Sequence, residues 1–257
     1  MDKLLTENKF KDILNNLDIK KTDKILVNSN ILNLILESKD KKIPKKIFNS
    51  LIEQISPLGT LLFPTFNWDF CKGLEFDFKK TKSSTGALSN LSLETKHFVR
   101  SKNPIYSFSI FGQNKNKISK LEHYSCFGMD SPFGFLIKNK GKNLFIDLDY
   151  KDAFTFVHVA EESVGVNYRY HKTFSGKYIN ENKIEKKKSF EMYVRKKNIV
   201  SKTVIDSKFD LKLLENNAIK KISYNNINFS IVDIQIAYNL MVEDIKLNQG
   251  LIRPILN

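Results

Sequence analysis

The chain has 257 residues, and its hydrophobic fraction of 41%, with 12% aromatic residues, is enough to bury a core in one large domain or two small ones. Its net charge of +14 normally indicates an anionic partner, such as a nucleic acid, an acidic membrane face or a phosphorylated substrate. No stretch approaches the roughly 18 uncharged apolar residues of a membrane helix, and residues 1–17 lack the charge-free core of a secretory signal. We therefore expect a cytoplasmic protein that does not enter a membrane.

Two lysine-rich stretches, residues 39–46 and 183–197, carry much of the positive charge. Such stretches are either solvated faces or binding sites, and the sequence leaves both interpretations open. A nucleic-acid-binding protein would use them with an affinity that falls steeply as salt rises. We keep this as a remote alternative and expect no nucleic acid partner.

The apolar spacing predicts helices and strands that alternate along the chain, which is typical of an α/β fold. Asp152 is the expected N-cap of one helix, and residues 68–85 are typical of a long loop. No repeat or linker interrupts the pattern, so we expect one domain over residues 1–257, with a basic C-terminal portion at 177–257. The expected helices lie at 3–17, 44–55, 114–123, 154–164 and 210–222, with a last helix ending at Leu247; the expected strands lie at 24–27, 60–63, 106–111, 143–148 and 228–232, with an antiparallel stretch around 190–200.

Several common catalytic signatures are absent from the sequence. It has no glycine-rich dinucleotide loop, no phosphate loop, no His-Glu-x-x-His zinc helix and no Gly-x-Ser-x-Gly elbow. Its two cysteines, Cys71 and Cys126, are too few and too far apart for a metal site or a disulfide framework, so we expect two thiols and no bound metal. The common forms of hydride transfer, ATP hydrolysis, zinc hydrolysis and ester hydrolysis lose support.

One predicted helix carries a polar stripe suited to acid–base chemistry. Thr155, His158 and Glu161 follow one another at i, i+3 and i+6, so they project from one helix face. A carboxylate beside a histidine holds its tautomer and raises its basicity, and a near-neutral histidine suits removal of a proton from an attacking amine. By itself the pattern also fits an ordinary core or surface histidine, which is the more common case.

Six blocks, in order over residues 24–176, resemble the aminoglycoside 3-N-acetyltransferase family. Residues 59–66 (GTLLFPTF) are similar to the family's Gly-Thr-Leu-x-x-Pro-Thr strand end, and residues 155–161 (TFVHVAE) to its Thr-x-Leu-His-x-Ala-Glu helix. Two departures are Asn103, which stands where the family usually has His, and residues 27–30 (VNSN), which replace Val-His-Ser-Ser-Leu. The remaining matches are residues 84–88, 99–104, 107–108 and 130–134, with Gly112 and His123.

The resemblance implies a single layered αβα domain with a mixed central sheet. It also implies direct transfer of an acetyl group from acetyl-CoA to an amine, with no acyl-enzyme and no metal. His158 would be the general base, and Glu161 would orient it. The residues assigned to the coenzyme A side, through backbone amides or hydroxyls, are Asn28, Ser29, Asn30, Thr65, Ser107, Ser131 and Thr155.

Residues 168–172 (YRYHK) place three aromatic rings and two fixed cations in five positions. We name Tyr168, Tyr170, His171 and Lys172 as candidate acceptor-binding residues, with Arg169 and Lys172 able to grip phosphate. A half-buried strand explains the same pattern equally well.

The net charge also bears on the acceptor amine. A polycationic antibiotic would be repelled by about 1 kcal/mol or more for each close like charge, whereas an anionic acceptor would be attracted. We therefore predict a nucleotide-linked amino sugar used for a surface glycan, with aminoglycoside modification as the alternative. A local acidic pocket would overrule the net charge, and its candidate residues are Asp147, Asp149, Asp152 and Glu162. The sequence also leaves open that the protein is a catalytically inactive scaffold, and that it forms a homodimer.

Overall fold

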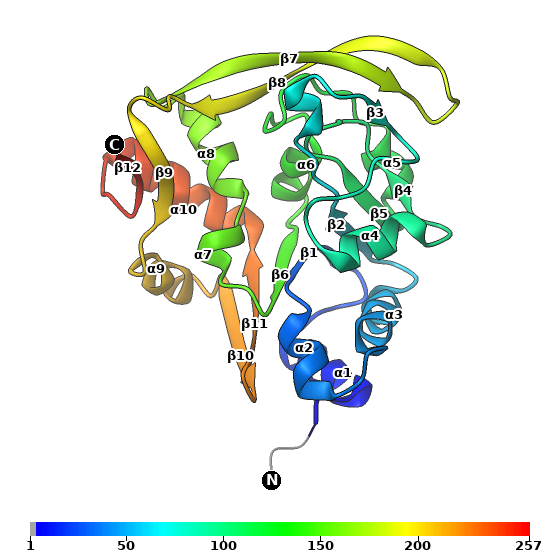
Figure 1. The fold of residues 1–257 in the computed structure, drawn as a ribbon. Coiled ribbons are helices and arrows are strands. Elements are labelled where there is room, and N and C mark those ends of the chain that lie inside the picture. Colours follow the sequence, from blue (N-terminus) through cyan, green and yellow to red (C-terminus); the bar gives the residue numbers. More distant parts are fainter. Residues whose placement is uncertain (1–3) are drawn as a thin grey trace.

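The computed structural model describes residues 4–257 and contains a seven-stranded mixed sheet with helices on both faces (Figure 1). The strand order is β10-β11-β6-β1-β2-β5-β4, in which β6, β1 and β2 are parallel and the other neighbours are antiparallel. The strands are β1 (Lys24–Ser29), β2 (Thr60–Pro64), β4 (Val99–Arg100), β5 (Phe108–Gly112), β6 (Lys142–Ile146), β10 (Ile219–Tyr224) and β11 (Ile227–Asp233).

Alternate residues of the central strands enter two separate hydrophobic clusters, because successive side chains of a strand point to opposite faces. Leu26 and Leu62 belong to one cluster, whereas Ile25 and Leu61 belong to the other. The first cluster is covered by α5 (Lys115–Ser119), α6 (Pro132–Lys138), α7 (Tyr150–Ala153), α8 (Phe156–Val164), α9 (Phe209–Glu215) and α10 (Ile234–Leu247), and the second by α1 (Glu7–Asn16), α2 (Leu32–Ser38), α3 (Ile43–Ile55) and α4 (Ala87–Glu94). The predicted αβα fold with a mixed sheet is confirmed.

A long hairpin lies across one end of the layered core (Figure 1). Its strands are β7 (Arg169–Ile179) and β8 (Glu185–Arg195), and β7 also pairs with the short β3 (Phe76–Asp77). After β8 the chain continues into β9 (Val200–Ile205), which pairs with β12 (Ile252–Leu256). The hairpin therefore extends from the end of α8 to the loop that contains the 3-10 helix η1 (Asp69–Lys72) and β3.

Two predicted helices are wrong in part. The helix expected over 154–164 starts only at Phe156, because Phe154 has a non-helical backbone; Asp152 lies inside α7, which Asp149 caps. The helix expected over 210–222 ends at Glu215, since Asn217 adopts a left-handed conformation, and the residues from Ile219 form β10.

Other predicted elements agree with the structure to within a few residues, although the start of the helix expected from residue 3 lies outside the described residues. The antiparallel stretch expected around 190–200 is β8, and its partner β7 begins well before it, at Arg169. No helix of residues 4–257 is both long and apolar enough to cross a bilayer.

Candidate functional site

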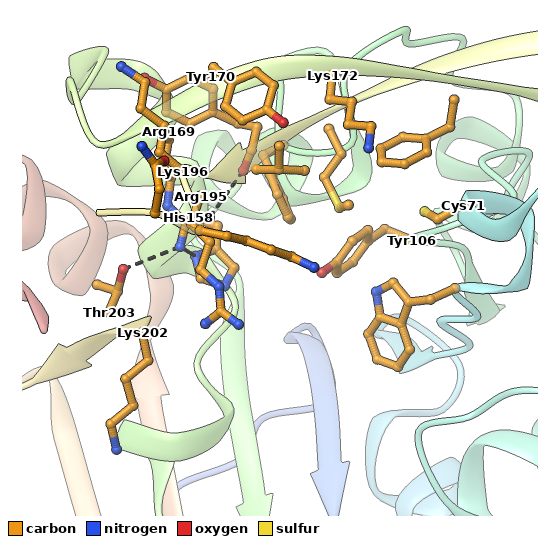
Figure 2. Close-up of a pocket in the computed structure, with 18 residues that line it drawn as sticks. Cys71, Tyr106, His158, Arg169, Tyr170, Lys172, Arg195, Lys196, Lys202 and Thr203 are labelled. Carbon is orange, nitrogen blue, oxygen red and sulfur yellow. Dashed lines mark hydrogen bonds between the residues drawn. The ribbon is translucent and has the colours of Figure 1, made fainter. Parts of the chain in front are cut away.

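A cavity of about 980 Å³ opens beneath the β7–β8 hairpin (Figure 2). Its wall is formed by the loop after β2, by α8, by both hairpin strands and by β9. His158 of α8 contributes the imidazole, and six aromatic residues supply much of the apolar surface: Trp68, Tyr106, Phe127, Tyr170, Phe174 and Tyr193. A cavity that combines aromatic surface with converging polar groups is typical of a small-molecule site.

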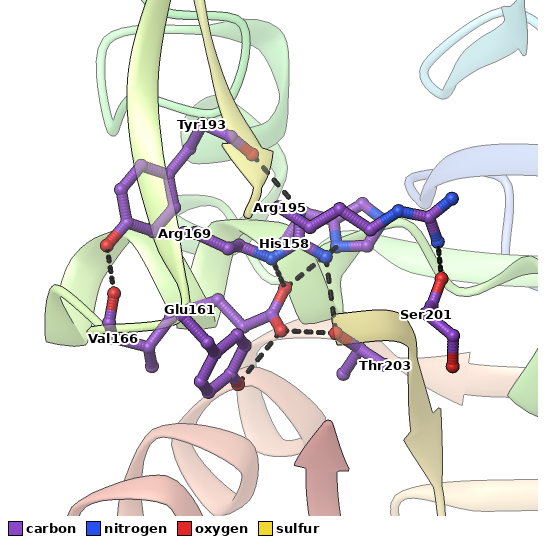
Figure 3. Close-up of polar contacts among 9 residues, drawn as sticks. His158, Glu161, Val166, Arg169, Tyr193, Arg195, Ser201 and Thr203 are labelled. Atoms are coloured by element: carbon purple, nitrogen blue, oxygen red, sulfur yellow. Dashed lines mark hydrogen bonds and ion pairs between the residues drawn. The ribbon is translucent and has the colours of Figure 1, made fainter. Parts of the chain in front are cut away.

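His158 and Glu161 are directly hydrogen-bonded, with His158 Nδ1 2.9 Å from Glu161 Oε2. The Glu161 side chain is fully buried, while that of His158 is 29% exposed. The carboxylate therefore lies behind the imidazole, and the imidazole faces the cavity (Figures 2 and 3).

Arg169, the first residue of β7, completes this network. Its Nε lies 2.7 Å from Glu161 Oε2, and its Nη1 donates to the Tyr193 carbonyl oxygen at 3.1 Å. Its Nη2 donates to Thr203 Oγ1 at 3.2 Å and lies 3.0 Å from His158 Nδ1. The expectation that Arg169 grips a phosphate is corrected, because its guanidinium is buried and already held by protein groups.

The Glu161 carboxylate makes four polar contacts, two at each oxygen (Figure 3). Besides His158 and Arg169 at Oε2, Tyr168 Oη donates to Oε1 at 3.0 Å and Thr203 Oγ1 donates to Oε1 at 2.7 Å. Burial alone would raise the pKa of Glu161, but its hydrogen bond to His158 and the charge of Arg169 outweigh this effect and lower that pKa. Glu161 is thus an ionised, fully satisfied buried carboxylate.

These contacts decide how the imidazole is used. Arginine only donates and a carboxylate only accepts, so His158 Nδ1 either donates to Glu161 or accepts from Arg169. We assign the proton to Nδ1, because Arg169 Nη2 has Thr203 Oγ1 as another acceptor. Nε2 of His158 then keeps its lone pair, which is the state required of a base.

A tight turn brings Arg169 back to the helix that carries its partner. Gly165 ends α8 in a left-handed conformation with φ of 74°, and its N–H donates to the Glu161 carbonyl oxygen at 3.0 Å. Glycine adopts this conformation without the steric cost that a side chain brings. The chain then reverses within four residues, so that the start of β7 faces the last turn of α8.

The seven residues expected to contact coenzyme A lie outside the lining of this cavity. Asn28 Nδ2 donates to the Ala153 carbonyl oxygen at 3.2 Å, and Asn30 Oδ1 accepts from Leu32 N at 3.2 Å. Ser29 ends β1 and Thr155 directly precedes α8, and both are half-buried.

Thr65, Ser107 and Ser131 are fully buried. The hydroxyls of Thr65 and Ser107 lie 2.9 Å apart, and Ser131 Oγ accepts from Gly134 N at 3.4 Å as the N-cap of α6. The contacts seen for these side chains are within the protein, and the roles of all seven residues toward acetyl-CoA stay predictions.

The four candidate acceptor residues separate into two groups along β7. Tyr170 and Lys172 line the cavity. Tyr168 instead binds Glu161 through its hydroxyl, and His171 points elsewhere, with its Nδ1 2.7 Å from Glu191 Oε1. Contact between the first pair and an acceptor stays a prediction.

Two further residues of the family-like blocks, Asn103 and His123, contact backbone groups of turns. Asn103 is buried, and its Oδ1 accepts from Ile105 N and Tyr106 N, both at 2.9 Å. His123 Nδ1 lies 2.7 Å from the Ser125 carbonyl oxygen. In the part of the chain that the structure describes, no group of three or more His, Cys, Asp or Glu side chains is placed to hold a metal ion.

The sequence profile of the aminoglycoside 3-N-acetyltransferase family matches residues 37–245, which is most of the chain. The chain belongs to this family. It is therefore an acyl-CoA-dependent N-acetyltransferase, with acetyl-CoA as co-substrate and a small-molecule amine as acceptor. The family membership predicted from the six blocks is confirmed.

Solved structures with a similar fold include aminoglycoside acetyltransferase AAC(3)-Xa, which is 16% identical with a TM-score of 0.77 over 94% of this chain and 93% of that one. AAC-IIIb in a binary complex with CoASH is 16% identical, with a TM-score of 0.75 over 96% and 98%. The YokD protein from Bacillus subtilis is 18% identical, with a TM-score of 0.76 over 97% and 96%. Identities this low show a shared fold only. Among curated protein sequences, none is similar enough to count as a match.

Proposed function

We propose that this enzyme transfers the acetyl group of acetyl-CoA directly to the amine of an amino sugar, with His158 as the general base. The observation that carries the proposal is the position of His158 between the buried carboxylate of Glu161 and the cavity. Acetyl-CoA is an intracellular metabolite, so we place the reaction in the cytoplasm.

In this reaction Nε2 of His158 takes a proton from the amine as its nitrogen attacks the thioester carbonyl carbon. The C–N bond forms, the C–S bond breaks, and the coenzyme A thiolate leaves and takes up a proton. Nδ1–H of His158 stays hydrogen-bonded to Glu161, whose negative charge stabilises the imidazolium that forms. Glu161 can do this at neutral pH because its pKa is lowered and it is ionised.

The two acceptor classes differ in charge, and different observations favour them. Membership of the family favours an aminoglycoside, and one solved structure of similar fold is AAC-VIa bound to sisomicin. The net charge of +14 favours the second candidate, an anionic amino sugar such as a nucleotide-linked one made for a surface glycan.

A thiol-release assay with acetyl-CoA tests the reaction against aminoglycosides, free amino sugars and nucleotide-linked amino sugars. We expect His158→Ala to lower kcat by about 10²–10⁴-fold, the usual contribution of a general base. His171→Ala is the matched control, because this histidine also contacts a glutamate but lies outside the cavity lining. Turnover by His158→Ala equal to that of the native enzyme would refute the mechanism.

A further inference from the structure

The lining of the cavity carries positive charge that is paired with no carboxylate of residues 4–257. The five residues Lys172, Arg195, Lys196, Lys197 and Lys202 line the cavity and are called the cationic wall below (Figure 2). No Asp or Glu lines the same cavity, and within residues 4–257 none of the five forms an ion pair. Like charges gathered around a concave surface repel one another, so the arrangement favours an anionic occupant.

Two members of the cationic wall are neighbours of residues that contact the His158–Glu161 pair. Arg195 is the register partner of Arg169, whose Nη2 is 3.0 Å from His158 Nδ1. Lys202 directly precedes Thr203, the residue that donates to Glu161. Arg195 is also held in place, since its Nη1 donates to the Ser201 carbonyl oxygen (Figure 3).

The acidic residues that might reverse this charge lie elsewhere. Asp147 and Asp149 line a separate cavity of about 240 Å³, and Asp152 is exposed on α7. Both Glu162 oxygens accept from Ser125 Oγ, at 2.7 and 2.9 Å. None of these four residues lines the cavity with His158, so no acidic pocket there would attract a polycation.

Coenzyme A is itself anionic, but its phosphates lie far from the reacting atoms. The whole pantetheine arm separates the diphosphate from the thioester, and the thioester carbonyl has to lie beside His158 for the amine to attack it. The five cations share one cavity with His158, so we place them near the acceptor and not near the phosphates of an extended donor.

We infer that the cationic wall is a subsite for a phosphate group carried by the acceptor, so that the enzyme acetylates a phosphorylated amino sugar. This inference rests on the proposed acetyl transfer. Arg195 presents a planar fork of donors that matches a phosphate, and the lysines add mobile charges around it. The same five charges would repel a polycationic acceptor. Of the two acceptor candidates, the cationic wall therefore favours the anionic one.

The test uses the full chain with His158→Ala, which keeps the wall but lacks the base, saturated with coenzyme A. Glucosamine 6-phosphate, glucosamine and an aminoglycoside are then titrated by calorimetry. We expect glucosamine 6-phosphate to bind in addition to coenzyme A, and at least about tenfold more tightly than glucosamine or the aminoglycoside. Binding that coenzyme A abolishes would instead assign the wall to the donor, and tighter binding of the aminoglycoside would overturn the inference.

A second set of variants identifies the wall itself. We expect Arg195→Gln with Lys202→Gln to weaken glucosamine 6-phosphate binding by about tenfold or more and to raise its KM in the native background, with the KM for acetyl-CoA little changed. Lys41→Gln with Lys45→Gln removes the same charge from exposed positions by α3 and is the control. Equal affinity in the two double variants would overturn the inference. Because binding is measured in a variant that lacks the base, the phosphate subsite is tested separately from the proposed acetyl transfer.

Discussion

Two buried arginines, Arg169 and Arg100, differ in what surrounds them. Arg169 contacts a carboxylate and an imidazole at the edge of a cavity. Arg100, 5% exposed, is surrounded by neutral groups: it donates to Ser107 Oγ at 3.0 Å and to the carbonyl oxygens of Thr81 at 2.6 Å and Thr65 at 3.3 Å. Among the described residues Arg100 has no ion pair, and burial lowers its pKa to about 10.

The two arginines thus differ in whether an acidic partner and a cavity lie beside them. Arg100 fastens the loop after β2 to β4 through carbonyl groups, and its guanidinium also lies 4.7 Å over the Phe76 ring. Arg169 is paired with the ionised Glu161, which also contacts the partly exposed imidazole of His158. Burial of a cation is therefore common to both sites, and an acidic partner beside a cavity distinguishes Arg169.

The largest expected effect is that of Arg169→Gln. Removing one member of a buried ion pair costs about 3–5 kcal/mol of stability, and loss of the geometry around the base costs about 10²-fold in kcat. Glu161 without its cation should also have a higher pKa, so the loss of stability on acidification should begin at a higher pH. Urea unfolding at several pH values and kcat of the folded variant measure these effects. A native kcat would show that Arg169 acts only in folding.

Glu161→Gln tests the same network from the acidic side. The folded-state pKa of Glu161 lies below its ordinary value of 4.5, so the unfolded chain binds a proton more readily. Its contribution to stability is therefore complete above about pH 4.5 and is lost as pH falls through the lower folded-state value. Thermal unfolding between pH 7 and pH 3 should show the native protein losing stability more steeply than Glu161→Gln. Parallel curves would contradict this role.

Arg100→Gln should affect stability without affecting chemistry. It leaves the buried Thr65 carbonyl and the half-buried Thr81 carbonyl without their donor, at a cost of about 1–3 kcal/mol. We expect kcat of the folded enzyme to stay near the native value at a temperature where the variant is folded. A loss of kcat as large as that of Arg169→Gln would erase the distinction between the two arginines.

The smallest expected effect is that of Thr203→Val, which removes the hydroxyl between Glu161 and Arg169 but nearly keeps the side-chain shape. A net loss of about 1–2 kcal/mol of stability is expected for a hydrogen bond to a charged group. Ser107→Ala is the matched change beside Arg100. Urea unfolding of the two variants compares them, and only Thr203→Val should also lower kcat.

Residues close together in the sequence account for what was predictable about the site. His158 and Glu161 lie three apart on one helix, so helical geometry alone brings them together, and the ordered blocks identify the family. The alternation of apolar segments likewise predicts the α/β layers. The sequence predicted the helix boundaries near Phe154 and Asn217 less well, because the backbone conformation at a helix end depends on contacts outside the helix.

The sequence by itself thus determined the fold class, the family and the histidine–glutamate pair, since each depends on neighbours along the chain. Only the tertiary structure showed that Arg169 and Thr203 complete the pair, because they reach it from two different strands. It alone showed that the five cations share a cavity with His158 and that the four acids lie outside this cavity, since net charge contains no information about position. This placement of charges depends on the pairing of β7 with β8 and with β3, which are distant from α8 in the sequence.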